Sequence, residues 1–238
     1  MIKNINNRLI LLRHAESLWN KENLYTGWYN IGLTESGRKK TKDMVTVLIK
    51  KNLIPNMIYT SAQLRAIQTA DIIHNELIKK NVNHNIPIIS NWHLNERHYG
   101  LLTGLNKTIL KNTYTKETVH SWVNSYYGNP PIIKLNDLST HILERIPNFN
   151  SGIYGNEIRE GESLELVYNR VVPYFNKNIM SKIKDGNTIM IVSHSNTIRV
   201  LIKYLENIDI NHIRDIKVKN IDPITYKFNE NFTPERIN

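Results

Sequence analysis

The stretch RLILLRHAES, residues 8–17, carries a short apolar run that ends abruptly on two basic side chains. Four consecutive Leu and Ile residues are typical of a β-strand buried on both faces, as strands of a parallel sheet are. Arg13 and His14 follow directly, at the carboxyl end of this expected strand. Ligands of open α/β sheets bind outside the carboxyl ends of the strands, so this position is the first candidate for a functional site.

Strand-like and helix-like segments alternate along the rest of the chain. Further strands are expected over 56–61, 86–90, 187–193 and 224–228, and helices over 34–52, 62–80, 107–127, 162–184 and 196–207. This alternation predicts an α/β fold with a mostly parallel central sheet and helices on both faces. We interpret residues 1–238 as a single domain, with an irregular excursion at about 128–161 that is rich in Pro, Gly, Asn and Ser.

The bulk composition narrows the class of protein. The chain has 238 residues and a 40% apolar fraction, which is enough for a sizeable core. Its longest apolar runs fall far short of the roughly 18 residues that cross a bilayer, so we expect a soluble, cytoplasmic protein without a membrane partner. Cysteine is absent, which excludes disulfide scaffolds, thiolate zinc sites and cysteine nucleophiles.

The net charge of +10 is compatible with either a nucleic acid or a small anion as the ligand. Lysines are spread along the chain, with no block of like charges and no interleaved aromatic residues. This distribution is typical of a solvated surface. We therefore expect a small anionic substrate and no nucleic-acid partner.

Polar and charged side chains follow several of the expected strands. Arg13 and His14 end the first strand, Arg65 follows the second, Glu96 follows the third, and His194 ends the fourth. Each of them alone has an ordinary structural explanation, as a strand cap, a surface cation or half of an ion pair. Because parallel strands bring their carboxyl ends to one edge, we expect the five to converge on one crevice.

This set of side chains suits phosphoryl transfer. Arg13 and Arg65 can clamp phosphate oxygens and stay charged. One imidazole, kept neutral by the neighbouring guanidinium charge, can attack phosphorus, and the other, protonated, can neutralise charge on the transferring group. Glu96 can act as general acid and base. The residues predict phosphoryl transfer through a phosphohistidine.

A metal site is the weaker interpretation. The sequence has no H-E-x-x-H motif and no cysteine, and two arginines in the same crevice would repel a divalent cation. A P-loop, a G-x-S-x-G elbow and a G-x-G-x-x-G loop are also missing. We expect no metal.

Several motifs carry a family resemblance. LLRHAES (11–17) resembles the Arg-His-Gly-Glu-Ser signature of the histidine phosphatase superfamily, while YTGWYNIGLTESG (25–37) and LNERHYGLLTGLNK (94–107) resemble its cofactor-dependent phosphoglycerate mutase branch. ESLELVYNRVVPYF (162–175) and HSNTIRVLIKYLEN (194–207) extend the resemblance over nearly the whole chain. It implies interconversion of 3-phosphoglycerate and 2-phosphoglycerate in glycolysis and gluconeogenesis, with 2,3-bisphosphoglycerate as primer.

The resemblance also implies a role for each site residue. His14 would carry the phosphoryl group, Arg13 and Arg65 would hold phosphate, Glu96 would be the acid and base, and His194 would stabilise the transferring group. Further phosphate or substrate contacts are implied at Ser17, Asn20, Thr26, Gly27, Arg97, Tyr99, Lys107, Ser195 and Asn196. The family is often dimeric or tetrameric, so a homodimer or homotetramer is expected.

Four departures from the family pattern keep an alternative open. Ala15 and Ser195 each replace a Gly, and the family usually continues past Asn238. Val123 and Asn124 stand where the family has an arginine pair that meets the far, anionic end of the substrate. A site with a weaker clamp and lid would release its phosphoryl group to water, so the alternative is a phosphatase of a small phosphorylated metabolite. A binding protein without catalysis is the third possibility.

Overall fold

A six-stranded sheet forms the centre of the molecule. The computed structural model describes residues 7–82, 85–131 and 161–238. In sheet order the strands are β3 (Ile88–Ser90), β2 (Met57–Thr60), β4 (Thr188–Ser193), β1 (Arg8–Arg13), β5 (Ile224–Phe228) and β6 (Pro234–Arg236). The first four run parallel, whereas β5 and β6 are antiparallel to their neighbours. The expected mostly parallel sheet is confirmed, and the short edge strand β6 is an addition.

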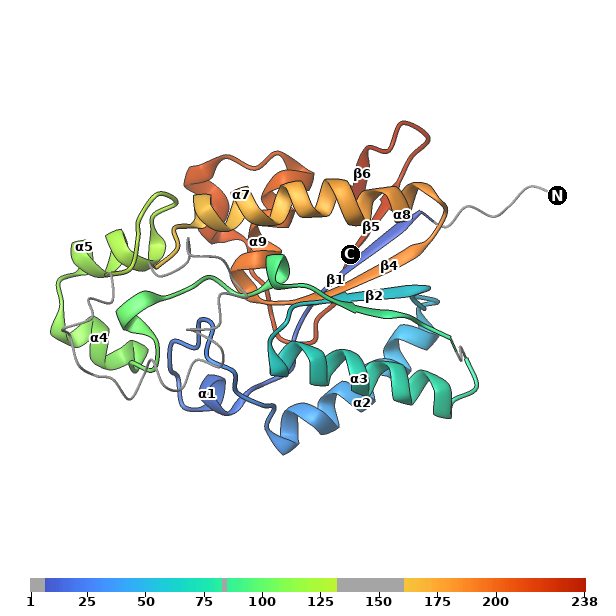
Figure 1. Ribbon diagram of the computed structural model, residues 1–238, viewed down its shortest axis with the longest axis horizontal. Helices are drawn as coiled ribbons and strands as arrows, with labels where there is room; N and C mark the ends of the chain where they lie inside the picture. Colours follow the sequence, from blue (N-terminus) through green and yellow to red (C-terminus); the bar gives the residue numbers. More distant parts are fainter. Residues whose placement is uncertain (1–6, 83–84, 132–160) are drawn as a thin grey trace.

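Helices cover both faces of the sheet (Figure 1). One face carries α2 (Glu35–Lys50) and α3 (Leu64–Lys79), and the other carries α7 (Leu164–Tyr174), α8 (Met180–Lys184) and α9 (Ser195–Glu206). Side chains of β1 alternate between these two layers, because Leu9 and Leu11 pack in one buried cluster and Ile10 and Leu12 in the other. The continuous apolar run of β1 therefore reflects burial on both faces.

The pairing of β1 with β4 brings two distant histidines together. The strands lie in parallel register with Arg13 beside Ser193, and the main-chain N–H of His14 donates to Ser193 O at 2.9 Å. His14 and His194 therefore leave the sheet at the same edge. Every residue of β4 is buried, as is expected for the strand between two neighbours in the middle of the sheet.

The prediction of one continuous helix over 107–127 is wrong, because the segment is divided into shorter helices. It forms α4 (Lys107–Thr113), α5 (Lys116–Val119) and a π-type turn, η3 (His120–Asn124). Thr115 separates the two helices, since its backbone is extended and its hydroxyl accepts from Thr118 N at 3.2 Å as the N-cap of α5. A capping side chain of this kind competes with continuation of the preceding helix.

The other segments differ from expectation mainly at their ends. The helix expected over 162–184 is α7, a π-type turn η4 (Phe175–Ile179) and α8 in succession. The change of helix type follows Pro173, whose ring disfavours a regular interior turn.

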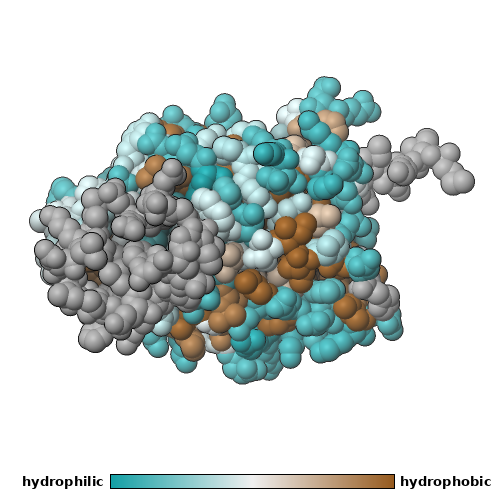
Figure 2. All heavy atoms as spheres, viewed as in Figure 1, coloured by the Kyte–Doolittle hydropathy of each residue, from teal (hydrophilic) through white to brown (hydrophobic). Residues whose placement is uncertain are grey.

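Residues 132–160 of the expected excursion lie outside the described residues. Among the described helices, none combines the length and apolarity of a membrane span. Hydrophilic side chains cover much of the face in Figure 2, with hydrophobic ones between them.

Candidate active site

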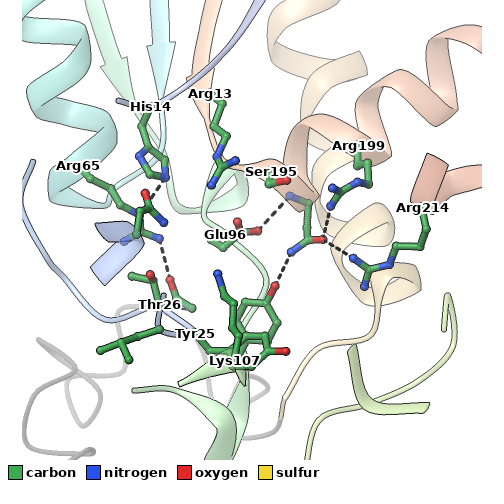
Figure 3. A pocket seen from close by; sticks show the side chains of 15 residues that line it. Arg13, His14, Tyr25, Thr26, Arg65, Glu96, Lys107, Ser195, Arg199 and Arg214 are labelled. Carbon is green, nitrogen blue, oxygen red and sulfur yellow. Dashed lines mark hydrogen bonds between the residues drawn. The ribbon is translucent and has the colours of Figure 1, made fainter. Parts of the chain in front are cut away.

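A cavity of about 250 Å³ lies at the carboxyl end of the sheet, where β1 and β4 deliver their basic residues. Figure 3 shows the side chains that surround it. Eleven of the residues named from the sequence line this cavity: Arg13, His14, Asn20, Thr26, Gly27, Arg65, Glu96, Tyr99, Lys107, Ser195 and Asn196. The structure therefore brings together segments that are far apart in the chain.

His14 is held as a neutral imidazole. Its Nδ1 lies 2.7 Å from Ala15 O, and because a carbonyl only accepts, Nδ1 carries the proton. Nε2 then keeps its lone pair, which accepts from Arg65 Nε at 3.3 Å. Burial, followed by the charges of Arg65 and Arg13, holds the pKa of His14 well below 6.5. A neutral imidazole with an available Nε2 lone pair is the form that can attack phosphorus.

His194 lies beside His14, is fully buried and is not among the residues that line the cavity. The two ring centroids are 4.9 Å apart, and His194 Nε2 lies 2.7 Å from Ser61 Oγ. Burial, and then the charge of Arg65, holds the pKa of His194 well below 6.5. The second imidazole was expected to be protonated. Burial and the neighbouring guanidinium charge lower its pKa and so favour the neutral form in this structure.

Glu96 is the carboxylate of the cavity and is only 8% exposed. Its Oε1 accepts from Arg97 N at 2.8 Å and from Asn196 N at 3.3 Å, so main-chain donors orient it. The carbonyl of Glu96 accepts from Trp28 Nε1 at 2.5 Å and from Arg170 Nη2 at 3.0 Å. The carboxylate and its main chain are thus fixed from two sides.

A buried ion pair that sequence reasoning missed supports the segment before and after Glu96. Arg170 Nε lies 2.6 Å from Glu162 Oε1, and Arg170 also donates to the carbonyls of His93 and Asn95. Burial alone would raise the pKa of Glu162, but the charge and hydrogen bonds of Arg170 lower it. Residues 95–98 adopt neither helix nor strand, so this pair supplies the rigidity that regular structure would otherwise give.

Arg65 and Gln63 connect His14 and Glu96 to the loop at Gly27. Arg65 Nη2 donates to Gly27 O at 2.9 Å, and Gln63 Nε2 donates to the same oxygen at 2.8 Å. Gln63 Oε1 in turn accepts from Glu96 N at 2.8 Å. Gly27 has a φ of +50°, and a Cβ added there would lie 3.2 Å from Tyr99 N. Glycine is therefore required for this close approach.

The cavity is strongly cationic. Of the described residues that line it, one is a carboxylate and five carry positive charge, namely Arg13, Arg65, Lys107, Arg199 and Arg214. Burial lowers the pKa of each of the five, and that of Arg65 falls to about 10. The N-terminus of α9 also faces this space through Ser195 and Asn196, and helix N-termini favour anions. The arrangement suits a small molecule with several negative charges.

Three residues named from the sequence do not line the cavity: Ser17, Arg97 and His194. Ser17 caps α1 (Leu18–Lys21), and its hydroxyl accepts from Asn20 N at 3.2 Å. Arg97 is fully buried and donates to Val123 O at 3.0 Å and to Trp122 O at 2.7 Å. Ser17 and Arg97 thus hold neighbouring backbone in place.

Four lining residues were not foreseen: Leu24, Tyr25, Arg199 and Arg214. Arg199 lies four residues after Ser195 on α9, and residues four apart lie on the same face of a helix. This spacing from the end of β4 could have predicted that Arg199 faces the cavity. Arg214 comes from the 3-10 helix η5 (Ile210–Asp215), and no local pattern points to it. Within the described residues, no group of three or more His, Asp or Glu side chains suited to a metal occurs.

The profile of the histidine phosphatase superfamily (branch 1) matches residues 9–139 and 133–234. A 2,3-bisphosphoglycerate-dependent phosphoglycerate mutase from Buchnera aphidicola subsp. Schizaphis graminum is 39% identical over 229 residues, which cover 95% of each chain. A protein of the same name from Bifidobacterium longum (strain DJO10A) is 37% identical over 227 residues, covering 95% of this chain and 88% of the relative.

Solved structures show the same fold at low sequence identity. A protein described as mycobacterial hydrolase 1 has a TM-score of 0.73 at 18% identity, over 97% of this chain and 96% of its own. A mycobacterial glucosyl-3-phosphoglycerate phosphatase in complex with VO3 has a TM-score of 0.71 at 18% identity, with the same coverage. At this identity the likeness extends to the fold alone.

Proposed function

Because the chain belongs to the histidine phosphatase superfamily and, within it, to the 2,3-bisphosphoglycerate-dependent phosphoglycerate mutases, we propose that it interconverts 3-phosphoglycerate and 2-phosphoglycerate. The observation that carries the proposal is one cavity in which cationic side chains surround a neutral imidazole and a carboxylate. The imidazole can accept a phosphoryl group, the carboxylate can move a proton, and the cations can bind the anionic substrate. The reaction serves glycolysis and gluconeogenesis.

His14 is the proposed phosphoryl acceptor. Ala15 O holds the Nδ1 proton, so the Nε2 lone pair forms the bond to phosphorus while the phosphorus–oxygen bond to the substrate breaks. Arg65 Nε, which donates to that lone pair in this structure, is then released toward a phosphoryl oxygen. Arg13 faces the same cavity and adds a second guanidinium to the phosphate site.

Glu96 is the proposed acid and base. As the phosphoryl group moves to His14, the substrate oxygen that loses phosphorus gains a proton from Glu96. In the return step the attacking hydroxyl gives its proton back to Glu96. Main-chain N–H groups of Arg97 and Asn196 hold Oε1, so proton transfer is assigned to Oε2.

His194 is proposed to act as a neutral hydrogen-bond donor toward the transferring group. Its Nε2 pairs with Ser61 Oγ, which fixes the ring beside His14. Its buried Nδ1 has no hydrogen-bond partner among the described residues.

The proposed primer is 2,3-bisphosphoglycerate, and the side chains present suit it. It supplies the phosphoryl group that first loads His14. Its charges match the lining cations and the N-terminus of α9. We propose that the remaining lining residues contact phosphate or substrate: Asn20, Thr26, Gly27, Tyr99, Lys107, Ser195 and Asn196. Ser17 and Arg97 are proposed to act by positioning, through the backbone that they hold.

A product assay tests the function. The protein is incubated with 3-phosphoglycerate and a trace of 2,3-bisphosphoglycerate, and the phosphorus species are followed by NMR. The expected product is 2-phosphoglycerate without inorganic phosphate. His14→Ala is expected to abolish turnover and covalent labelling, whereas His74→Ala, on α3 and outside the cavity lining, serves as the matched control. Inorganic phosphate as the main product would favour the phosphatase alternative.

Association of copies and location in the cell are further proposals. Among the described strands, β3 pairs only with β2 and ends the sheet, and Ile89 on it is 36% exposed. An edge strand with an exposed apolar residue can pair with a second copy, so we propose a homodimer, or a tetramer built from dimers. Sedimentation analysis measures this state directly. A glycolytic role supports a cytoplasmic location.

A further inference from the structure

Two arginines at the cavity wall, Arg199 and Arg214, have no individual role in the reaction as described above. Arg199 comes from α9 and Arg214 from η5, and their Nη1 atoms lie 3.0 and 3.4 Å from the same oxygen, Asn196 Oδ1. Figure 3 shows both guanidinium groups on the opposite side of Glu96 from His14 and Arg65. Two separate elements therefore bring positive charge to one end of the cavity.

Within the part of the chain that the structure describes, neither guanidinium is in direct contact with a carboxylate, although the charge of Glu96 in the same cavity acts on both. No ion pair found there includes Arg199 or Arg214. Arg214 Nη2 is buried and has no hydrogen-bond partner among the described residues. Burial lowers the pKa of both groups, that of Arg214 to about 10, and the charge of Arg199 adds to the effect on Arg214. Two guanidinium groups held together in this way form a site for an anion.

Arg214 lies close to positions 123 and 124, where the resemblance implies an arginine pair that this chain lacks. Val123 is only 6% exposed and packs in an apolar cluster with Tyr25, and neither Val123 nor Asn124 lines the cavity. Arg214 Nε, however, donates to Asn124 O at 3.1 Å. A guanidinium from η5 thus contacts the backbone of Asn124, one of the two positions at which the resemblance implies an arginine.

We propose that Arg199 and Arg214 bind the carboxylate of the phosphorylated acid, in place of the arginine pair absent at 123 and 124. The inference rests on the proposed function, because it takes a phosphoglycerate as the ligand. A planar guanidinium fork matches a carboxylate, and two forks on one group orient it as well as bind it. His14, Arg65 and Arg13 engage the phosphate, and the carboxylate then lies at the other end of the cavity.

Calorimetric binding of two ligands tests the assignment. 3-Phosphoglycerate and glycerol 3-phosphate carry the same phosphate, but the second has an alcohol in place of the carboxylate. Arg214→Gln is expected to weaken 3-phosphoglycerate binding about tenfold to a hundredfold, the range for one hydrogen bond to a charged group, with a far smaller effect on glycerol 3-phosphate. Arg199→Gln is expected to act in the same direction. Arg8→Gln is the matched control, since Arg8 begins β1 at the end away from the cavity.

Specific results would overturn the inference. If Arg214→Gln weakened the binding of both ligands equally, Arg214 would be assigned to the phosphate. The inference would also fail if Arg214→Gln left 3-phosphoglycerate binding unchanged. It would fail as well if the wild-type protein bound both ligands with the same affinity. Arg214→Lys provides a second test in case the Gln variant folds poorly, because it keeps the positive charge but lacks the planar guanidinium. It is expected to weaken the binding of 3-phosphoglycerate more than that of glycerol 3-phosphate.

Failure of the two proposals can be told apart, because binding needs no turnover. Selective binding in a protein that releases inorganic phosphate would refute the mutase function alone. An active mutase whose ligand selectivity survives Arg214→Gln would refute the carboxylate site alone.

Discussion

Neutralising Glu162 is expected to destabilise the protein strongly at neutral pH. The side chains of Arg170 and Glu162 are 8% and 6% exposed, and Glu162 also accepts from His98 N at 2.7 Å. Glu162→Gln keeps the shape of the side chain but leaves the Arg170 charge buried without its carboxylate. Removal of one partner from a buried ion pair costs about 3–5 kcal/mol. The amide oxygen still accepts a hydrogen bond, but in either orientation the amide NH2 then faces a donor of Arg170 or His98, so we expect a loss of at least about 3 kcal/mol, the lower end of that range.

The magnitude can be measured by urea and thermal unfolding. For a chain of this size, 1 kcal/mol shifts the melting temperature by about 2–4 °C, so a loss near 3 kcal/mol corresponds to a decrease of about 6–12 °C. Glu76→Gln is the matched control, because it breaks an ion pair to Lys79, whose side chain is 66% exposed. An exposed pair is worth at most about 1 kcal/mol, so the control should change little.

The pH dependence gives a second, independent readout. The pKa of Glu162 is lowered in the folded state relative to its ordinary value of 4.5. A lowered carboxyl pKa contributes stability above the unfolded pKa, and this contribution is lost as pH falls through the folded pKa. The stability difference between wild type and Glu162→Gln should therefore be full at pH 7 and shrink below about pH 4. A loss no larger than that of Glu76→Gln, or a difference that stays constant on acidification, would refute the reasoning.

Two further predictions concern the site itself. The pKa values of His14 and His194 are held well below 6.5, so both imidazoles stay neutral as pH falls through that value, and the acid limb of kcat/KM is expected below it. An imidazole titration at or above pH 6.5, once the substrate's own phosphate titration has been subtracted, would contradict this. Gly27→Ala is expected to cost about 1–3 kcal/mol in urea unfolding, because a φ of +50° strains any other residue and the added Cβ would crowd Tyr99 N. Retention of wild-type stability would show that the loop relaxes without cost.

The sequence alone was sufficient for the layered fold and for much of the cavity. Local periodicity reports how many faces of a strand are buried, as the unbroken apolar run of β1 does. In a parallel sheet every strand also presents its carboxyl end at one edge, so Arg13, His14 and Glu96 can be grouped by their positions after the expected strands. Both inferences depend only on neighbours along the chain and on a general rule of sheet topology.

Only the tertiary structure decided the charge states and the partners of the site. Whether His194 is protonated depends on its burial beside Arg65, which no spacing in the sequence reports. Arg170 and Glu162 are eight residues apart, yet their pairing matters because Arg170 also holds carbonyls of the loop around Glu96. Arg214 reaches the cavity from a short 3-10 helix, because η5 follows α9 back toward the sheet edge. These contacts join segments through space, and sequence periodicity carries information only about residues a turn or a strand apart.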